Sequence, residues 1–235
     1  MSGDVLLAAV RSGLAGAADP AKAGPMQRYM KSTMPFHGVS MPDVRRIVRP
    51  LVAAHPLDDR AAWERAVRAL YAGASHREER YAALELAGHR RYRAFRDADA
   101  LPLFAWLAGV GAWWDLVDAV ASLVDEVLRA HPDAARPAVR EWATTDDLWL
   151  RRIAIIGQLK AKAATDLDLL THAIDANLVG SVFGDEFFIR KAIGWALRQH
   201  ARTDADWVRA FVAERGEALA PLSRREALKH VGPGA

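Results

Sequence analysis

Apolar residues recur along this chain at the three- and four-residue spacing of amphipathic helices. In the segment 114–130, Leu116, Val120, Leu123 and Val127 repeat at i, i+4, i+7 and i+11, which predicts a helix with one buried stripe. Prolines separate further stretches rich in Ala, Leu and Arg, and the alternating pattern of strands is almost absent. The sequence therefore predicts an all-α fold.

The chain also repeats itself. The segment 147–159 (DLWLRRIAIIGQL) aligns without a gap on 185–197 (DEFFIRKAIGWAL), and 75–86 (SHREERYAALEL) fits the same register. The small residue that marks this register stands at Ala82, Ala119, Ala154, Ala192 and Ala227, with gaps of 37, 35, 38 and 35 residues. Such a period is typical of two-helix repeats that bury their apolar faces by stacking. We therefore expect one domain over 1–235, made of HEAT-like helical hairpins in a curved solenoid, with 231–235 as a frayed tail.

Basic residues follow the same repeat. An arginine stands two positions before the small residue in most copies, at Arg80, Arg152, Arg190 and Arg225, and Arg45 has the same relation to Ile47. In a stack of hairpins the second helices line the concave side, so these residues predict a basic concave face. Two roles remain open for each arginine: a bond to the neighbouring repeat, or contact with an anionic ligand.

An indole and a carboxylate share the side of segment 114–130 opposite its buried stripe. Trp114 and Asp118 are four residues apart and therefore neighbours on that face, with Ser122 and Asp125 further along it. One interpretation is a tryptophan packed under a loop beside a solvated aspartate. The other is a stacking platform for a flat cationic or aromatic ligand, next to a carboxylate that stabilises positive charge.

Arg152 has Leu148, Trp149, Ile155 and Ile156 as helical neighbours, so its charge stands in an apolar setting and requires an anionic partner. A buried carboxylate or a phosphate would satisfy it.

Two other aromatic residues stand among basic ones. Trp195 has Lys191, Arg198 and Gln199 as helical neighbours, and Tyr29 lies between Arg28 and Lys31. Basic grooves with interleaved aromatics follow a phosphate backbone and stack on nucleotides. Each aromatic alone favours core packing, and their joint occurrence weakens that interpretation.

The composition narrows the possible chemistry. The 235 residues include no Cys, which excludes disulfides, thiolate zinc sites and cysteine nucleophiles. The 32 Lys and Arg exceed the 29 Asp and Glu by only three, so any basic character must lie in its distribution. No two of the eight His are spaced i, i+4, so we expect no metal site, and no phosphate-binding loop is present. Since no apolar run is long enough for a membrane span, we expect a cytoplasmic, nucleoid-associated protein without membrane contact.

Five segments of the chain carry a family resemblance. In order and approximate spacing, PMQRYMK, GAWWDLVD, LWLRRIAI, EFFIRKAIGWALRQ and APLSRREALKH resemble the bacterial DNA alkylation repair glycosylases of the AlkD type, over about Pro25 to Val231. The resemblance implies a HEAT-like solenoid that wraps duplex DNA. It also implies a monofunctional DNA glycosylase that excises N3- and N7-alkylated purines in base excision repair, without a cofactor.

By motif match, the resemblance assigns the catalytic aspartate to Asp118, its flanking indoles to Trp114 and Trp195, and a phosphate-binding arginine to Arg152. An alkylated purine already carries positive charge and leaves readily, so one carboxylate suffices to stabilise the sugar cation and to position a water. We expect further contacts to double-stranded DNA from basic and aromatic residues around this site, and a monomer. These are Tyr29, Lys31, Arg45, Arg190, Lys191, Arg198, Arg224 and Arg225.

Two other interpretations stay open. The segment 107–111 (LAGVG) weakly matches the hairpin of helix-hairpin-helix glycosylases, although Ala108 replaces the usual proline and a simple interhelix turn also explains it. From a different class, a non-catalytic HEAT-like scaffold could bind DNA or a protein partner. Asp118 separates these classes, because a groove that only binds phosphate has no use for a carboxylate at its centre.

Overall fold

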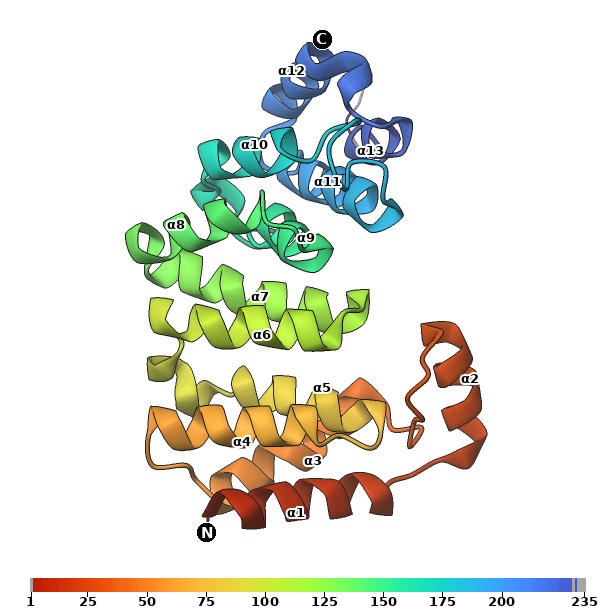
Figure 1. Ribbon diagram of the computed structural model, residues 1–235, viewed down its shortest axis with the longest axis vertical. Coiled ribbons are helices and arrows are strands. Elements are labelled where there is room, and N and C mark those ends of the chain that lie inside the picture. The colour runs from red at the N-terminus through yellow and green to blue at the C-terminus, as the bar shows by residue number, and fades with distance from the viewer. Residues whose placement is uncertain (1, 230, 232–235) are drawn as a thin grey trace. The chain divides into compact units, whose positions relative to one another are not determined.

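The computed structural model describes residues 2–229 and Val231, and within these residues every regular element is a helix (Figure 1). The all-α prediction is therefore confirmed. None of the helices in the described part of the chain has the length and apolar character that a membrane span requires.

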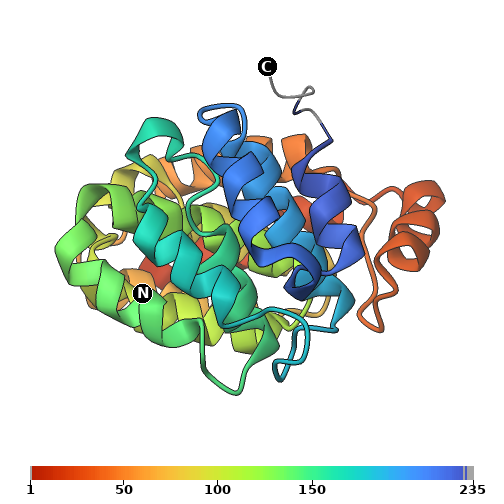
Figure 2. The same cartoon turned by 90° about the horizontal axis from the view of Figure 1, so that it is seen from above.

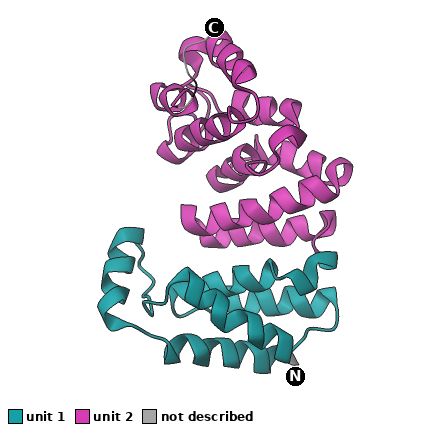
Figure 3. Ribbon diagram, turned by 180° about the vertical axis from the view of Figure 1, so that it is seen from behind, with its two compact units in different colours: residues 1–95 teal, residues 96–235 magenta. Residues whose placement is uncertain are grey.

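The chain divides into two compact units, residues 1–95 and 96–235 (Figure 3). The first unit holds α1 (Ser2–Gly16), α2 (Pro20–Met30), α3 (Met41–Ala54), α4 (Arg60–Ala72), α5 (Arg77–Ala87) and the 3-10 helix η1 (Arg90–Phe95). The second unit begins with η2 (Ala98–Ala100), α6 (Leu101–Gly111), α7 (Trp114–Ala130), α8 (Pro132–Trp142), α9 (Leu148–Ile156) and η3 (Lys162–Ala164). It continues with α10 (Leu167–Asp175), α11 (Phe187–His200), α12 (Ala205–Arg215), η4 (Gly216–Ala218) and α13 (Pro221–Ala227). The single domain over 1–235 stays a prediction, and the expected frayed tail lies, apart from Val231, outside the described residues.

The predicted helical-hairpin repeat is confirmed in the second unit. The marker residues Ala119, Ala154, Ala192 and Ala227 fall on α7, α9, α11 and α13, and each of these helices packs against the next (Figure 1). The alternate helices α8 and α10 pack on each other in a second row. In the first unit the corresponding helices α3 and α5 also pack together.

The apolar stripe of α7 is buried as predicted, with Leu116, Val120 and Val127 each 0% exposed. The sequence analysis was wrong about Asp125, which was expected on the solvent side and is buried. Its carboxylate accepts hydrogen bonds from Arg129 Nε at 2.9 Å and from the Lys160 backbone N–H at 3.3 Å. The reason is that the chain leaving α9 covers this end of α7.

The segment 107–111 is the last part of α6 and not a hairpin loop. Ala112, the residue after α6, takes a left-handed conformation with φ of 40° and turns the chain into α7. The interhelix turn expected at 107–111 is therefore also wrong in its position, since it follows this segment at Ala112 and Trp113. The helix α7 begins at Trp114, one turn before Asp118.

A glycine sets the approach of α11 to α13, which lie side by side in both views (Figure 1, Figure 2). A Cβ on Gly194 would stand 2.6 Å from the Cβ of Glu226 and 3.2 Å from the backbone oxygen of Ser223. Real Cβ atoms do not approach this closely, so only glycine allows the observed contact. Ser223 Oγ donates to the Arg190 backbone oxygen at 2.9 Å and links the same two helices.

We predict that Gly194→Ala lowers the free energy of unfolding by about 1–3 kcal/mol, because α11 and α13 must move apart to admit the methyl group. Gly109→Ala is the matched control, since a Cβ there meets nothing within 4 Å and a helical alanine is favourable. Urea titration of both variants tests this prediction. Equal stability of the two variants would contradict the packing argument.

Candidate active site

Asp118 on α7 and Arg152 on α9 form a bidentate ion pair. Arg152 Nε donates to one carboxylate oxygen at 2.7 Å, and Nη2 donates to the other at 2.9 Å. The third guanidinium nitrogen, Nη1, donates to the backbone oxygen of Phe188 at 2.6 Å. The side chains are 6% exposed for Arg152 and 19% exposed for Asp118, so the carboxylate faces the outside and the guanidinium lies behind it.

The sequence left two possible partners for Arg152, a buried carboxylate and a phosphate. The structure supplies the carboxylate, which belongs to Asp118. All three guanidinium nitrogens donate to oxygens of the protein, and the side chain is nearly buried. Its contact with a DNA phosphate stays a prediction. What the arrangement does show is that Arg152 fixes the direction of both Asp118 oxygens.

A cavity of about 460 Å³ lies beside Asp118 and is lined by Trp195 on α11. Polar groups on its wall come from Ser122 on α7, Lys160 after α9 and Gln199 on α11. The structure thus brings Asp118 and Trp195 together from helices two repeats apart. Trp114 lies one turn before Asp118 on α7, is half-buried, and stands outside the lining of this cavity.

An aromatic cluster supports the ion pair, and the sequence analysis did not find it. Trp113, Trp149 and Phe188 meet at the starts of α7, α9 and α11, with ring centroids 5.2–6.3 Å apart. Because the backbone oxygen of Phe188 accepts from Arg152, the packing of these rings also holds the guanidinium. The sequence does contain a signal for this cluster, because an aromatic residue stands at the start of each of three successive repeats.

Two of the expected DNA contacts, Lys191 and Arg198, are paired with Glu226 on α13. Lys191 Nζ lies 3.3 Å from one carboxylate oxygen, and Arg198 Nη1 donates to the other. Burial alone would raise the pKa of Glu226, but the charges of Lys191 and Arg198 outweigh it, so the pKa is lowered. The carboxylate therefore stays ionised at neutral pH.

The other predicted basic residues of this unit differ in their surroundings. Arg190 lies half-buried on α11, and its Nε has no hydrogen-bond partner among the described residues. On α13, Arg224 is half-buried and Arg225 is exposed. Their contact with DNA stays a prediction.

The remaining predicted contacts belong to the first unit. Arg45 Nε donates to Glu85 on α5 at 2.8 Å, which is the bond to a neighbouring repeat that the sequence left open. Arg80 stacks over the ring of Tyr71 at 5.1 Å. Tyr29 is 76% exposed, which rules out core packing, and Lys31 ends α2 in a left-handed conformation with φ of 50°.

The stacked helical hairpins define a helical-repeat protein. Its candidate catalytic site is a carboxylate held by an arginine, with a tryptophan beside the same cavity. The family model described as "DNA alkylation repair enzyme" matches residues 10–231. The chain therefore belongs to the DNA alkylation repair enzyme family. A solved structure titled "Predicted DNA alkylation repair enzyme from Enterococcus faecalis" is similar to this chain, with a TM-score of 0.76 and 29% identity over 92% of this chain and 98% of that one. No curated protein matches.

We predict that Arg152→Gln lowers the free energy of unfolding by about 2–4 kcal/mol, because it leaves a carboxylate that is only 19% exposed without its cationic partner. A double-mutant cycle with Asp118→Asn measures the coupling by urea titration. The double variant should be no less stable than Arg152→Gln alone. Additive losses would show that the two side chains do not interact in solution.

Proposed function

We propose that this protein is a monofunctional DNA glycosylase that hydrolyses the N-glycosidic bond of N3- and N7-alkylated purines in duplex DNA. The observation that carries the proposal is the Asp118 carboxylate, held by Arg152 at the edge of a cavity lined by Trp195. Membership of a DNA alkylation repair family supports this reaction class.

Asp118 is the proposed catalytic residue. As the bond from C1′ to the purine nitrogen breaks, the bonding electrons pass to the alkylated base, which leaves neutral, and positive charge develops on the deoxyribose. A nearby carboxylate stabilises that charge. It also accepts a proton from the water that attacks C1′, as the second carboxylate does in glycoside hydrolysis.

Arg152 is the proposed positioning residue for Asp118. Each carboxylate oxygen accepts one hydrogen bond from the guanidinium, so each keeps a further lone pair for a water or a sugar C–H. A fixed carboxylate needs no reorganisation when charge develops, and this preorganisation contributes to lowering the barrier.

Trp114 and Trp195 are the proposed walls of the site. An indole packs against a sugar by dispersion and C–H/π contact, and it excludes bulk water from the reacting centre. Trp195 lines the cavity directly, whereas Trp114 would contact the nucleotide from the preceding turn of α7. The other proposed contacts to the duplex come from both units. They are Arg190, Lys191 and Arg198 on α11, Arg224 and Arg225 on α13, and Tyr29, Lys31 and Arg45 in the first unit.

One observation favours a second candidate, the non-catalytic scaffold. The Asp118–Arg152 pair satisfies both charges and joins α7 to α9, as a purely structural ion pair between repeats would do. In that case DNA or a protein binds, and no base is released.

We predict that Asp118→Asn slows base release from alkylated duplex DNA by about 100-fold or more, because the charge acts on the transition state. Helix content and affinity for undamaged DNA should be largely retained. Asp115→Asn, on the same helix, is the matched control and should release bases at the wild-type rate. Base release by Asp118→Asn at the wild-type rate would support the scaffold instead.

We predict that Trp114→Ala and Trp195→Ala reduce excision more than stability, with a loss of about 1 kcal/mol in the free energy of unfolding. Trp142→Ala, at a position only 8% exposed, serves as the core comparison and should cost about 3–5 kcal/mol. Denaturant titration and single-turnover base release measure the two effects. A core-type loss of stability in both site variants would show that these indoles are packing residues.

A further inference from the structure

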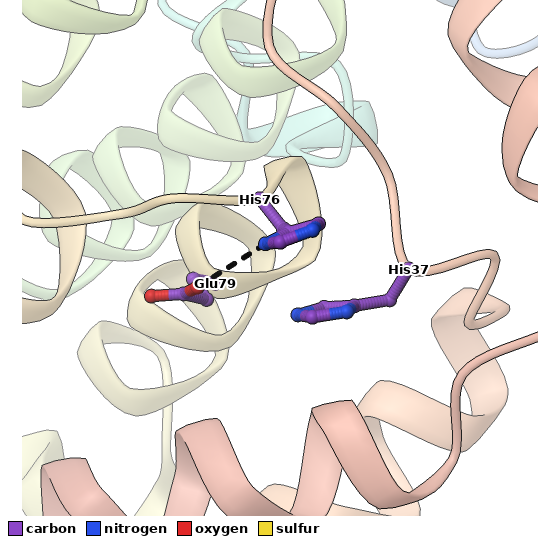
Figure 4. A group of neighbouring side chains, drawn as sticks. All are labelled: His37, His76 and Glu79. Carbon is purple, nitrogen blue, oxygen red and sulfur yellow. Dashed lines mark ion pairs between the residues drawn. The ribbon is translucent and has the colours of Figure 1, made fainter.

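A group of three potential metal ligands lies in the first unit, whereas Asp118 belongs to the second. His37 comes from the segment 31–40 between α2 and α3, and His76 and Glu79 come from the start of α5 (Figure 4). One ligand atom from each of the three lies within 4.8 Å of the other two. The two imidazole rings are stacked, with centroids 3.7 Å apart and an interplanar angle of 12°.

Backbone hydrogen bonds hold His37 in this position. The buried carboxylate of Glu78 accepts from the backbone N–H of His37 at 2.9 Å, of Gly38 at 2.8 Å and of Val39 at 3.0 Å. The Arg77 backbone N–H donates to the Pro35 oxygen at 2.9 Å. The backbone of the loop is therefore fixed to α5 by the Glu78 carboxylate and by one main-chain hydrogen bond, and the histidine ring takes no part in these bonds.

Glu79 is oriented as metal-binding carboxylates commonly are. It is 2% exposed, and one oxygen accepts from Ser75 Oγ at 2.6 Å while the other accepts from Arg11 Nε at 3.0 Å. Outer hydrogen bonds of this kind fix a ligating carboxylate and are typical of metal sites.

The two histidine rings make few polar contacts with the described residues. Within the described residues no hydrogen bond to the ring nitrogens of His37 is formed, and His76 Nδ1 contacts Ser75 Oγ at 3.0 Å. Two imidazoles and a carboxylate are a ligand set that zinc uses with an open fourth position. Histidine spacing along the chain predicted no metal site, but His37 and His76 are brought together by the fold.

We propose that His37, His76 and Glu79 bind one divalent transition-metal ion of the zinc class, with a water in the fourth position. Tetrahedral geometry with bonds of about 2.0–2.1 Å requires the ligand atoms to be roughly 3.3 Å apart. Side-chain rotation of the two rings out of their stack supplies this closure, and the backbone can stay in place. The ion would tie the segment that follows α2 to α5, independently of the proposed glycosylase reaction.

The first experiment is calorimetric titration of the metal-free, full-length protein with Zn²⁺. We expect one ion per chain, and binding weaker by about tenfold or more in His37→Ala and in His76→Ala. His131→Ala, which removes an exposed histidine elsewhere, should bind like wild type. Circular dichroism confirms that each variant is folded. Absence of a stoichiometric site in wild type, or equal affinity in all three variants, would overturn the proposal.

A second measurement needs no variant. Substoichiometric Cu²⁺ added to the wild-type protein should selectively broaden the ring resonances of His37 and His76 among those of the eight histidines. Uniform broadening, or broadening confined to other histidines, would overturn the proposal even if the variants fail to fold. Base release by the Asp118 variants is a separate measurement, so failure of one proposal leaves the other to be judged by its own result.

Discussion

The ion pair between Asp118 and Arg152 constrains the whole candidate site. A guanidinium that is almost completely buried is stable only where an anion and further acceptors surround it, and here the carboxylate on α7 and a backbone oxygen on α11 supply them. Three successive helices of the repeat must therefore keep their relative positions for the pair to exist. The aromatic contacts of Trp113, Trp149 and Phe188 hold these helices in that arrangement, and the close approach at Gly194 holds α11 against α13.

Much of this architecture could be predicted from the sequence because helices and hairpin repeats leave periodic signals. The stripe on α7 and the register of Ala119, Ala154 and Ala192 determine which helices pack and which faces meet. The partner of Arg152 is harder to predict from these periodic signals. Asp118 stands one position before its marker alanine and Arg152 two positions before the next one, so the register places them near each other without fixing their contact.

The features that were not predicted from the sequence arise where one segment of the chain packs over another. Asp125 lies on the face of α7 that the helical period marks as polar, but the segment after α9 covers it and pairs its carboxylate with a backbone N–H. His37 and His76 are separated by two helices, and they are brought together by the Glu78 side-chain carboxylate, which accepts from the backbone N–H of His37 and of the two residues after it. The hydrophobic period of one helix does not show which other segments of the chain pack over it.

Glu226 gives α11 a property that a count of basic residues does not reveal. Lys191 and Arg198 already share this carboxylate, so it acts as a counterion built into the protein. A phosphate that approached these side chains would exchange one anion for another, and it would release fewer ions from solution than two free cations would. The surface around Trp195 would therefore hold undamaged DNA less tightly than its cations indicate, which favours release and renewed search over tight binding at any one position.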